Sequence, residues 1–247
     1  MNVKGVGIGS GQPKVVVSFS NHSKETVDEE IKGVLDNPSA VDIVEIRSDA
    51  FDALSQEEHL QLVNHISEKL EDYPILYTYR TQSEGGKGQK TAVEYESLLN
   101  AVLDQCDIQL IDVEFFMYED IVDTLIEKAK RKGVLVVLSQ HDFRDTPDFD
   151  EIMATYKDMH ERGGDILKLA YNPADGRDVL SILTAVHDAR QQLKCQVVGI
   201  SMGELGKITR VAGGVFGSCL TYGYISHKAA PGQFHVQDLK NNLQIFE

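Results

Sequence analysis

Short apolar runs alternate with amphipathic stretches along the whole chain, and the pair recurs about every 30 residues, the length of one strand–helix unit. The apolar runs predict strands at 15–19, 43–47, 75–80, 108–115, 134–140, 166–170, 196–201 and 219–224. The stretches between them predict helices at 25–36, 55–71, 91–105, 118–132, 148–162, 175–193, 203–212 and 235–245. Eight such units in 247 residues favour a closed (β/α)8 barrel, with an open doubly wound sheet as the alternative.

Local signals at the ends of the elements agree with this pattern. Ser55 with Glu58 forms a capping-box sequence, Thr146-Pro147 is typical of a helix start, and Gly133 stands where a left-handed helix end is expected. Residues 3–14 precede the first barrel strand, and we expect them to form a hairpin that closes the bottom of the barrel. No linker or low-complexity tract interrupts the pattern, so residues 1–247 are expected to form one barrel domain.

The charge balance limits the class of partner. The chain has 39 acidic and 24 basic residues and a net charge of −15, which disfavours nucleic acid and anionic membranes. An anionic substrate would therefore need local arginines. No run of 18 apolar residues and no secretory signal are present. Cys106, Cys195 and Cys219 are far apart and lack metal-ligand spacing, which predicts free thiols and a cytoplasmic location.

Several predicted strands carry polar residues at alternate positions near their C-terminal ends. Residues two apart on a strand share a face, so each pair should point the same way. In barrels of this kind both faces of a strand are covered, and the active site lies at the C-terminal end. We therefore expect a polar cavity there, lined by the pairs Glu45/Arg47, Thr78/Arg80, Asp112/Glu114 and Ser139/His141 together with Lys168. Asp112 and Glu114 could serve only to hold the basic groups in place.

Lys168 stands within the apolar run Asp165-Ile166-Leu167-Lys168-Leu169-Ala170. Lysine is rarely buried without a partner, and removal from water lowers its pKa and favours the neutral amine. A neutral amine attacks carbonyl carbons. The alternative is a lysine whose stem is buried and whose ammonium reaches water.

His141 closes a strand and is the candidate general acid/base. A metal-binding role has little support, because no second histidine stands at ligand spacing. The other histidines fall in helices, where we expect surface positions, or in loops; these are His59, His65, His160 and His187 in helices and His22, His227 and His235 in loops or near helix starts.

Two glycine-containing segments are further candidate sites. The run 212–218 precedes the last strand, so close packing at the barrel bottom is favoured over phosphate binding. No GxGxxG follows a strand and no Walker sequence occurs, so nucleotide binding has no support. The segment Ala229-Ala230-Pro231-Gly232-Gln233 suits a lid over the top of the barrel.

Taken together, these segments resemble the type I 3-dehydroquinate dehydratase family over essentially the whole chain. The resemblance rests on the order and spacing of Val44-Glu45-Ile46-Arg47, Tyr79-Arg80-Thr81, Glu84-Gly85-Gly86, Ile111-Asp112-Val113-Glu114, Ser139-Gln140-His141-Asp142-Phe143, Lys168-Leu169-Ala170, Ser201-Met202-Gly203, Arg210 and Ala230-Pro231-Gly232-Gln233. It implies a (β/α)8 TIM barrel, a homodimer, and neither a metal nor an organic cofactor. It also implies a hydro-lyase of the shikimate pathway, which serves aromatic amino acid biosynthesis.

The resemblance implies a role for each matched residue. Lys168 would form a Schiff base with 3-dehydroquinate, His141 would be the general acid/base of a syn elimination, and Glu84 would orient it. Arg210 would bind the substrate carboxylate, a task that suits a guanidinium. The remaining substrate-binding positions would be Ser18, Glu45, Arg47, Arg80, Met202, Ala229 and Gln233. Ala229 departs from the serine that many members carry, which removes one side-chain hydrogen bond.

Two other functions remain open at this level. A class I aldolase-like barrel would also use a strand lysine, but would cleave a carbon–carbon bond. A barrel that only binds an anionic metabolite would show binding without turnover.

Overall fold

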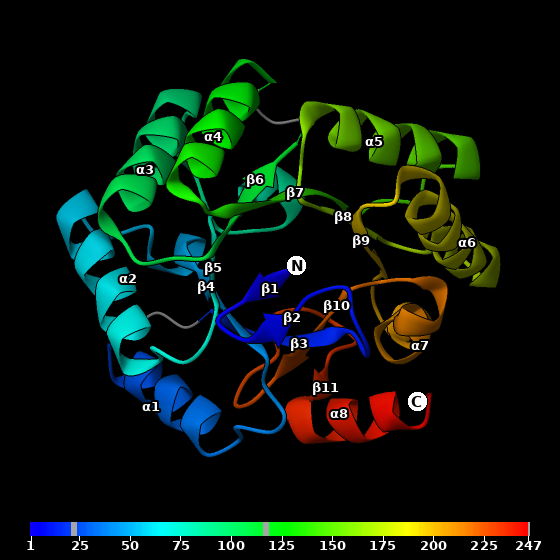
Figure 1. Ribbon diagram of the computed structural model, residues 1–247, viewed down its shortest axis with the longest axis horizontal. Coiled ribbons are helices and arrows are strands. Elements are labelled where there is room, and N and C mark those ends of the chain that lie inside the picture. The colour runs from blue at the N-terminus through cyan, green and yellow to red at the C-terminus, as the bar shows by residue number, and fades with distance from the viewer. Residues whose placement is uncertain (21–23, 116–118, 247) are drawn as a thin grey trace.

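The computed structural model describes residues 1–20, 24–115 and 119–246. In these residues parallel strands curl into a barrel surrounded by helices (Figure 1). The barrel strands are β3 (Lys14–Phe19), β4 (Ile43–Arg47), β5 (Ile75–Thr78), β6 (Leu110–Glu114), β7 (Leu135–Asp142), β8 (Ile166–Tyr171), β9 (Gln196–Ser201) and β10 (Leu220–Tyr224), and β11 (Phe234–His235) pairs with β10. The hydrogen-bonded order is β11-β10-β3-β4-β5-β6-β7-β8-β9.

The two ends of this sheet meet between β9 and β10. A parallel bridge joins Val197 to Ser218, and the N–H of Cys219 donates to the carbonyl oxygen of Val197 at 2.9 Å. This contact closes the cylinder, so the predicted closed barrel is confirmed over an open sheet.

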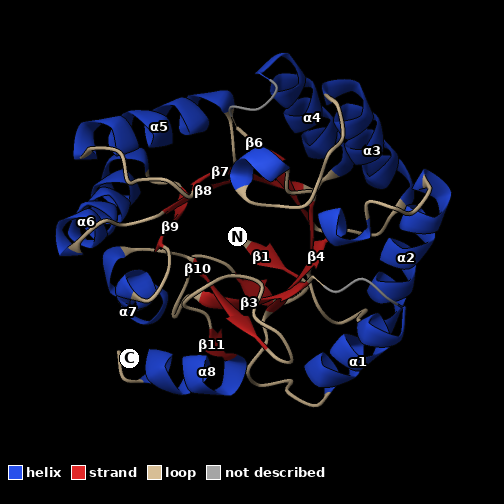
Figure 2. Cartoon of the chain, turned by 180° about the vertical axis from the view of Figure 1, so that it is seen from behind, coloured by secondary structure: helices blue, strands red, loops and turns tan. Residues whose placement is uncertain are grey.

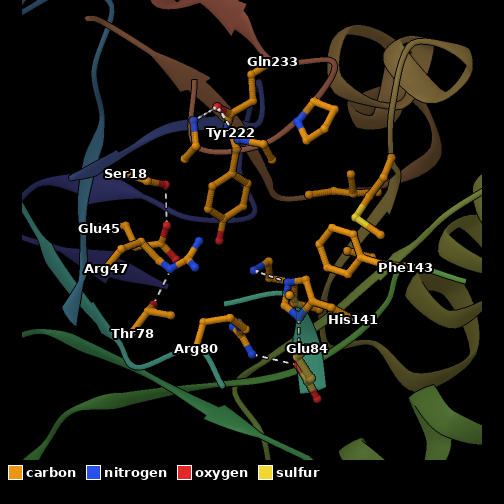
Figure 3. A pocket seen from close by; sticks show the side chains of 18 of the residues that line it. Ser18, Glu45, Arg47, Thr78, Arg80, Glu84, His141, Phe143, Tyr222 and Gln233 are labelled. Carbon is orange, nitrogen blue, oxygen red and sulfur yellow. Dashed lines mark hydrogen bonds and ion pairs between the residues drawn. The ribbon is translucent and has the colours of Figure 1, made fainter. Parts of the chain in front are cut away.

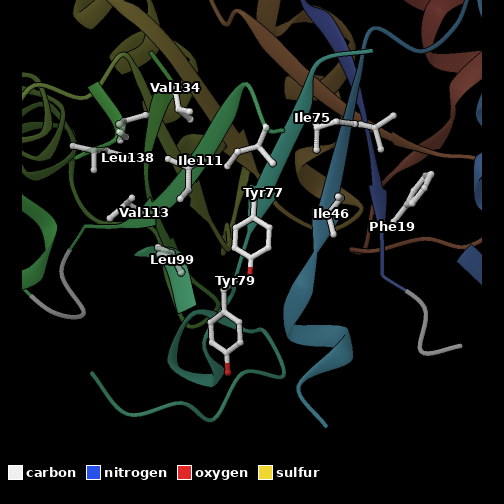
Figure 4. Packing of buried hydrophobic residues seen from close by; sticks show 14 of the residues in the cluster. Phe19, Ile46, Ile75, Tyr77, Tyr79, Leu99, Ile111, Val113, Val134 and Leu138 are labelled. Carbon is white, nitrogen blue, oxygen red and sulfur yellow. The ribbon is translucent and has the colours of Figure 1, made fainter. Parts of the chain in front are cut away.

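Helices cover the outer wall of the barrel on all sides (Figure 2). They are α1 (Lys24–Leu35), α2 (Gln56–Lys69), α3 (Ala92–Gln105), α4 (Glu119–Lys132), α5 (Phe149–Arg162), α6 (Gly176–Leu193), α7 (Ile208–Phe216) and α8 (Val236–Gln244), with 3-10 turns η1 (Ser48–Phe51), η2 (Gln82–Glu84) and η3 (Leu205–Lys207). Apolar residues on the outward faces of the strands form one core with apolar residues of these helices, and Figure 4 shows Tyr77 of β5 and Leu99 of α3 among its members. Among the described residues, no helix is both long enough and apolar enough to span a bilayer.

The predicted helix ends are confirmed at two positions. Ser55 and Glu58 form a reciprocal capping box at the start of α2. Gly133 follows α4 with a φ of 73°, a left-handed conformation that glycine adopts without a side-chain clash. The N-cap of α5 is Asp148, just after Thr146-Pro147, and its side chain accepts from the N–H of Glu151.

The N-terminal hairpin closes the bottom of the barrel, as predicted. Strands β1 (Asn2–Val3) and β2 (Val6–Gly7) pair in antiparallel fashion, with Val3 opposite Val6. The hairpin lies across the barrel mouth in Figure 1. Ile8, which follows it, is completely buried and belongs to the apolar cluster inside the barrel.

Two element boundaries differ from the prediction for tertiary reasons. β5 ends at Thr78 rather than at residue 80, because the N–H of Arg80 donates to the Asp49 carboxylate instead of a neighbouring strand. α7 continues to Phe216 through Gly213 and Gly214. A Cβ on Gly214 would lie 2.5 Å from Cγ of Pro13, so this glycine permits close packing of α7 against the segment before β3.

The expected surface position of His59 is wrong. His59 is 2% exposed, and its Nε2 lies 3.0 Å from the hydroxyl of Tyr77 on the outer face of β5. Burial lowers the pKa of His59 to about 4, so the side chain is a neutral hydrogen-bonding group of the core. His22 lies outside the described residues.

Candidate active site

The inward-facing residues of the barrel form layers. The lower layer is apolar and takes one buried residue from each strand, namely Val16, Ile43, Leu76, Leu110, Val137, Ile166, Val198 and Leu220. Two positions further along, six strands instead present buried polar residues, namely Ser18, Glu45, Thr78, Asp112, Ser139 and Lys168. The apolar layer therefore supports a polar layer at the C-terminal end, where strand parity placed it.

A cavity of about 220 Å³ opens above this polar layer (Figure 3). All residues to which the family resemblance gave a catalytic or substrate-binding role line it: Ser18, Glu45, Arg47, Arg80, Glu84, His141, Lys168, Met202, Arg210, Ala229 and Gln233. Strand parity also placed Asp112, Glu114 and Ser139 at the cavity, but these residues do not line it; they are buried and hydrogen-bonded to Arg80 instead. Thr78, which strand parity predicted at the cavity, and Pro231 of the predicted lid also line it. Residues without any prediction there include Phe143, Ile200 and Tyr222.

An amine, an imidazole and a carboxylate form a chain along one wall of this cavity. Nζ of Lys168 lies 3.1 Å from Nε2 of His141, and Nδ1 of His141 lies 2.9 Å from Oε2 of Glu84. Lys168 and Glu84 are 4% and 7% exposed. The three groups thus meet at hydrogen-bond distance although they come from β8, β7 and η2, which are well separated in the sequence.

The electrostatic environment favours the uncharged forms of both bases. Burial lowers the pKa of Lys168, and the positive charges of Arg80 and Arg47 add to this effect against the attraction of Asp112 and Glu45. Burial also lowers the pKa of His141 well below its usual value, with further contributions from Arg80, Lys168 and Arg47. The surroundings thus shift Lys168 toward its neutral amine and His141 toward its neutral imidazole, the forms that nucleophilic attack and proton transfer require.

Arg80 connects the wall that carries Lys168, His141 and Glu84 to the polar layer below it. Its Nη1 donates to Glu84 at 2.8 Å, to Glu114 at 3.0 Å and to Ser139 at 3.0 Å, while Nη2 donates to Asp112 at 2.7 Å. Burial raises the pKa of Glu84, and Arg80 opposes that rise by stabilising the carboxylate. In its ionised form Glu84 accepts Nδ1–H of His141, and Nε2 is then the base that faces Lys168.

Asp112 also approaches the lysine, with Oδ2 4.0 Å from Nζ of Lys168. Together with its bond to Arg80, this contact matches the alternative that Asp112 holds the basic groups in place. Glu114 holds Arg80 in place in the same way, and it also accepts a hydrogen bond from the N–H of Thr81 at 2.8 Å.

On the opposite wall, hydrogen bonds to neighbouring residues hold Glu45 and Arg47 in place. Glu45 accepts hydrogen bonds from Ser18 and, at 2.9 Å, from Thr78. Arg47 makes a bidentate contact with Asp49, Nε–Oδ1 at 2.9 Å and Nη2–Oδ2 at 3.0 Å. Sequence reasoning missed Asp49, although its position two residues after Arg47 in a buried turn is the signal that could have found it.

Arg210 enters the cavity from α7. It is 3% exposed, and no carboxylate pairs with it among the described residues. Its guanidinium donates only to the carbonyl oxygens of Tyr222 at 3.5 Å and Pro231 at 3.3 Å, and its buried Nε has no partner in the described part of the chain. Burial lowers the pKa of Arg210 to about 10, so the group stays charged at neutral pH and suits an anionic ligand.

The segment from Ala229 to Gln233 borders the cavity from above. Oε1 of Gln233 accepts the N–H of Ala229 at 2.8 Å and that of Ala230 at 3.3 Å, which fixes the turn. The Gln233 side chain, which is expected to bind substrate, therefore also stabilises its own loop. Its amide nitrogen is the end left to donate.

Comparison with known proteins points to one family. The family model for type I 3-dehydroquinase matches residues 14–247. The 3-dehydroquinate dehydratases of Enterococcus faecalis and Bacillus subtilis are 37% and 36% identical, over 99% of this chain and 97% and 96% of theirs.

Solved structures show the same relationship. The 3-dehydroquinate dehydratase of Geobacillus kaustophilus superimposes with a TM-score of 0.94 at 30% identity, covering 100% of this chain and 95% of that one. The type I enzyme of Clostridium difficile, solved with covalently modified comenic acid, gives 0.94 at 32% identity, covering 99% and 96%. The chain therefore belongs to the type I 3-dehydroquinase family.

Proposed function

We propose that this chain is a 3-dehydroquinate dehydratase that converts 3-dehydroquinate to 3-dehydroshikimate, a hydro-lyase step of the shikimate pathway, through a Schiff base on Lys168. The names of its relatives and its family membership support the reaction. The observation that carries the mechanism is the 3.1 Å approach of a buried lysine amine to a histidine nitrogen inside the cavity.

Imine formation begins with the neutral amine of Lys168. It attacks the ketone carbon, and the resulting carbinolamine loses its oxygen as water to leave an iminium. Nε2 of His141 lies close enough to accept and return the protons of these steps. The lowered pKa of Lys168 increases the fraction of free amine, and burial limits the access of competing water.

Elimination follows on the iminium, which accepts electrons far better than a ketone. His141 removes the proton from the α-carbon, the electron pair shifts toward nitrogen, and the β-hydroxyl leaves with a proton from the same imidazole. One base on one face of the ring gives syn elimination. Water then hydrolyses the product imine and frees the amine. A transfer of this kind contributes about 10²–10⁴-fold to the rate.

The remaining residues bind the ring. Arg210 takes the carboxylate, since it is the cavity's buried arginine without an acidic partner among the described residues. Glu45 and Arg47, both held by their neighbours, and Gln233 contact the hydroxyls. Ser18, Met202 and Ala229 complete the wall, and Arg80 acts chiefly by holding Glu84. Family membership favours this reaction over aldol cleavage and over binding without turnover.

The enzyme is proposed to act as a homodimer in the cytoplasm. The family resemblance supports the dimer, and the three cysteines, which form no disulfide, are consistent with a reducing compartment. Light scattering after size-exclusion chromatography tests the dimer, because a mass near 27.4 kDa would instead indicate a monomer.

Replacement of the nucleophile tests the proposed reaction. Lys168→Ala should abolish the near-ultraviolet absorbance that the conjugated enone carboxylate product gives with the unmodified enzyme. Circular dichroism should show an unchanged fold. Appreciable turnover by a folded Lys168→Ala variant would refute the covalent mechanism.

A further inference from the structure

Tyr222 carries a buried hydroxyl that lacks a partner. It lies on β10, is 5% exposed, and enters the same cavity that Lys168 faces (Figure 3). Its hydroxyl makes no hydrogen bond within the described part of the chain. Buried tyrosine hydroxyls usually find a partner, because an unpaired polar group loses its hydration without compensation.

Other buried tyrosines of this barrel follow the usual rule. The hydroxyl of Tyr156 donates to the carbonyl oxygen of Val198 at 3.0 Å, and that of Tyr171 donates to Gln140 at 2.6 Å. The hydroxyl of Tyr79 donates to Asp52 at 2.8 Å. The unpaired hydroxyl of Tyr222 is therefore a feature of the cavity that it enters, and these other buried tyrosines do not share it.

The position of Tyr222 places it between the two groups that would hold the substrate. Nζ of Lys168 lies 4.8 Å from the centre of the Tyr222 ring. The main-chain carbonyl oxygen of Tyr222 accepts a hydrogen bond from Arg210. A molecule bound covalently to Lys168 and gripped at its carboxylate by Arg210 therefore has to pass the Tyr222 side chain.

The hydroxyl is suited to donate. Burial raises the pKa of Tyr222 well above its usual value, and the negative charges of Glu45 and Asp112 add to that rise. The phenol stays protonated at neutral pH, so it offers a proton to an acceptor oxygen. 3-Dehydroquinate carries several such oxygens, on its hydroxyls and its carboxylate.

We propose that Tyr222 is a substrate-binding residue of this enzyme, whose hydroxyl donates a hydrogen bond to an oxygen of the bound polyhydroxy ring acid. The proposal rests on the proposed function of the cavity. It also gives the site a polar contact in addition to those of the lid, where Ala229 has no side-chain donor. Tyr222 would then be a residue whose hydrogen bonding is completed only by substrate.

Tyr222→Phe isolates the hydroxyl because it keeps the ring beside Lys168. The dissociation constant of 3-dehydroquinate is measured by calorimetry in the Lys168→Ala background, where substrate is not consumed, and KM is measured in the otherwise unmodified enzyme. Loss of one hydrogen bond should raise both about tenfold. The Tm of the ligand-free protein should stay the same or rise, since an unpaired polar atom has been removed.

Tyr156→Phe is the matched control, because its hydroxyl bonds to the protein itself. That variant should lower Tm and leave the dissociation constant unchanged. A Tyr222→Phe variant that binds 3-dehydroquinate as tightly as its parent, whether or not its Tm falls, would overturn the proposal. If the unmodified enzyme does not dehydrate 3-dehydroquinate at all, the proposed function fails instead.

Discussion

Nε2 of His141 lies 3.1 Å from Nζ of Lys168, and burial disfavours the charged form of both groups. The pair joins a potential nucleophile to a potential base across the strands β7 and β8. Because Ser139 pairs with Lys168 and His141 with Ala170 in the strand register, the imidazole stands one layer above the lysine. This stagger lets the histidine reach substrate atoms next to the carbon that the amine attacks.

His141→Ala removes the base and keeps the nucleophile. We expect kcat to fall by about 10²–10⁴-fold, the usual contribution of a positioned acid/base group. His160→Ala is the control, since His160 is exposed on α5 and should leave kcat unchanged. Stopped-flow detection of the enone product provides the measurement, and a normal rate in His141→Ala would exclude the histidine from catalysis.

Arg47→Met tests the electrostatic tuning of the two bases. The positive charge of Arg47 lowers the pKa of both Lys168 and His141. Each base works in its neutral form, so activity falls as pH drops through its pKa in the folded enzyme. Without Arg47 both pKa values rise, and the acid limb of the kcat/KM profile should move to higher pH. A limb that stays in place or moves to lower pH would contradict this account.

His59→Phe tests whether burial of the core histidine makes stability depend on pH. Its pKa is lowered from 6.5 to about 4, so the unfolded chain binds more protons than the folded one between these values. Neutral, buried His59 makes its full contribution to the free energy of unfolding above pH 6.5, and that contribution is lost as pH falls toward 4. Between pH 7 and pH 5 the loss should be about 2 kcal/mol. Urea unfolding should show that loss in the parent and a smaller one in His59→Phe; equal losses would refute the assignment.

Strand alternation predicted the polar layer because side-chain direction on a strand is a local property. Glu45, Thr78, Asp112, Ser139 and Lys168 all face inward for that reason. Arg80 keeps the predicted direction even though β5 ends two residues earlier.

Periodicity could not place the residues that lie off the strands. Only the family resemblance identified Glu84 on η2 and Arg210 on α7 as site residues, because tertiary folding is what brings this turn and this helix to the cavity. Tyr222 was missed since a tyrosine in an apolar strand is typical of a core. His59 was misplaced because its partner, Tyr77, lies on another element. The assignment of residues 1–247 to one domain stays a prediction.

Borohydride trapping tests the central claim most directly. The enzyme is incubated with 3-dehydroquinate, reduced, digested and mapped by mass spectrometry, with Lys168→Ala and the exposed-lysine variant Lys132→Ala treated alongside. The account predicts one stable adduct on the peptide containing Lys168, present in Lys132→Ala and absent from Lys168→Ala. Full activity with no adduct, or an adduct at another lysine, would contradict it.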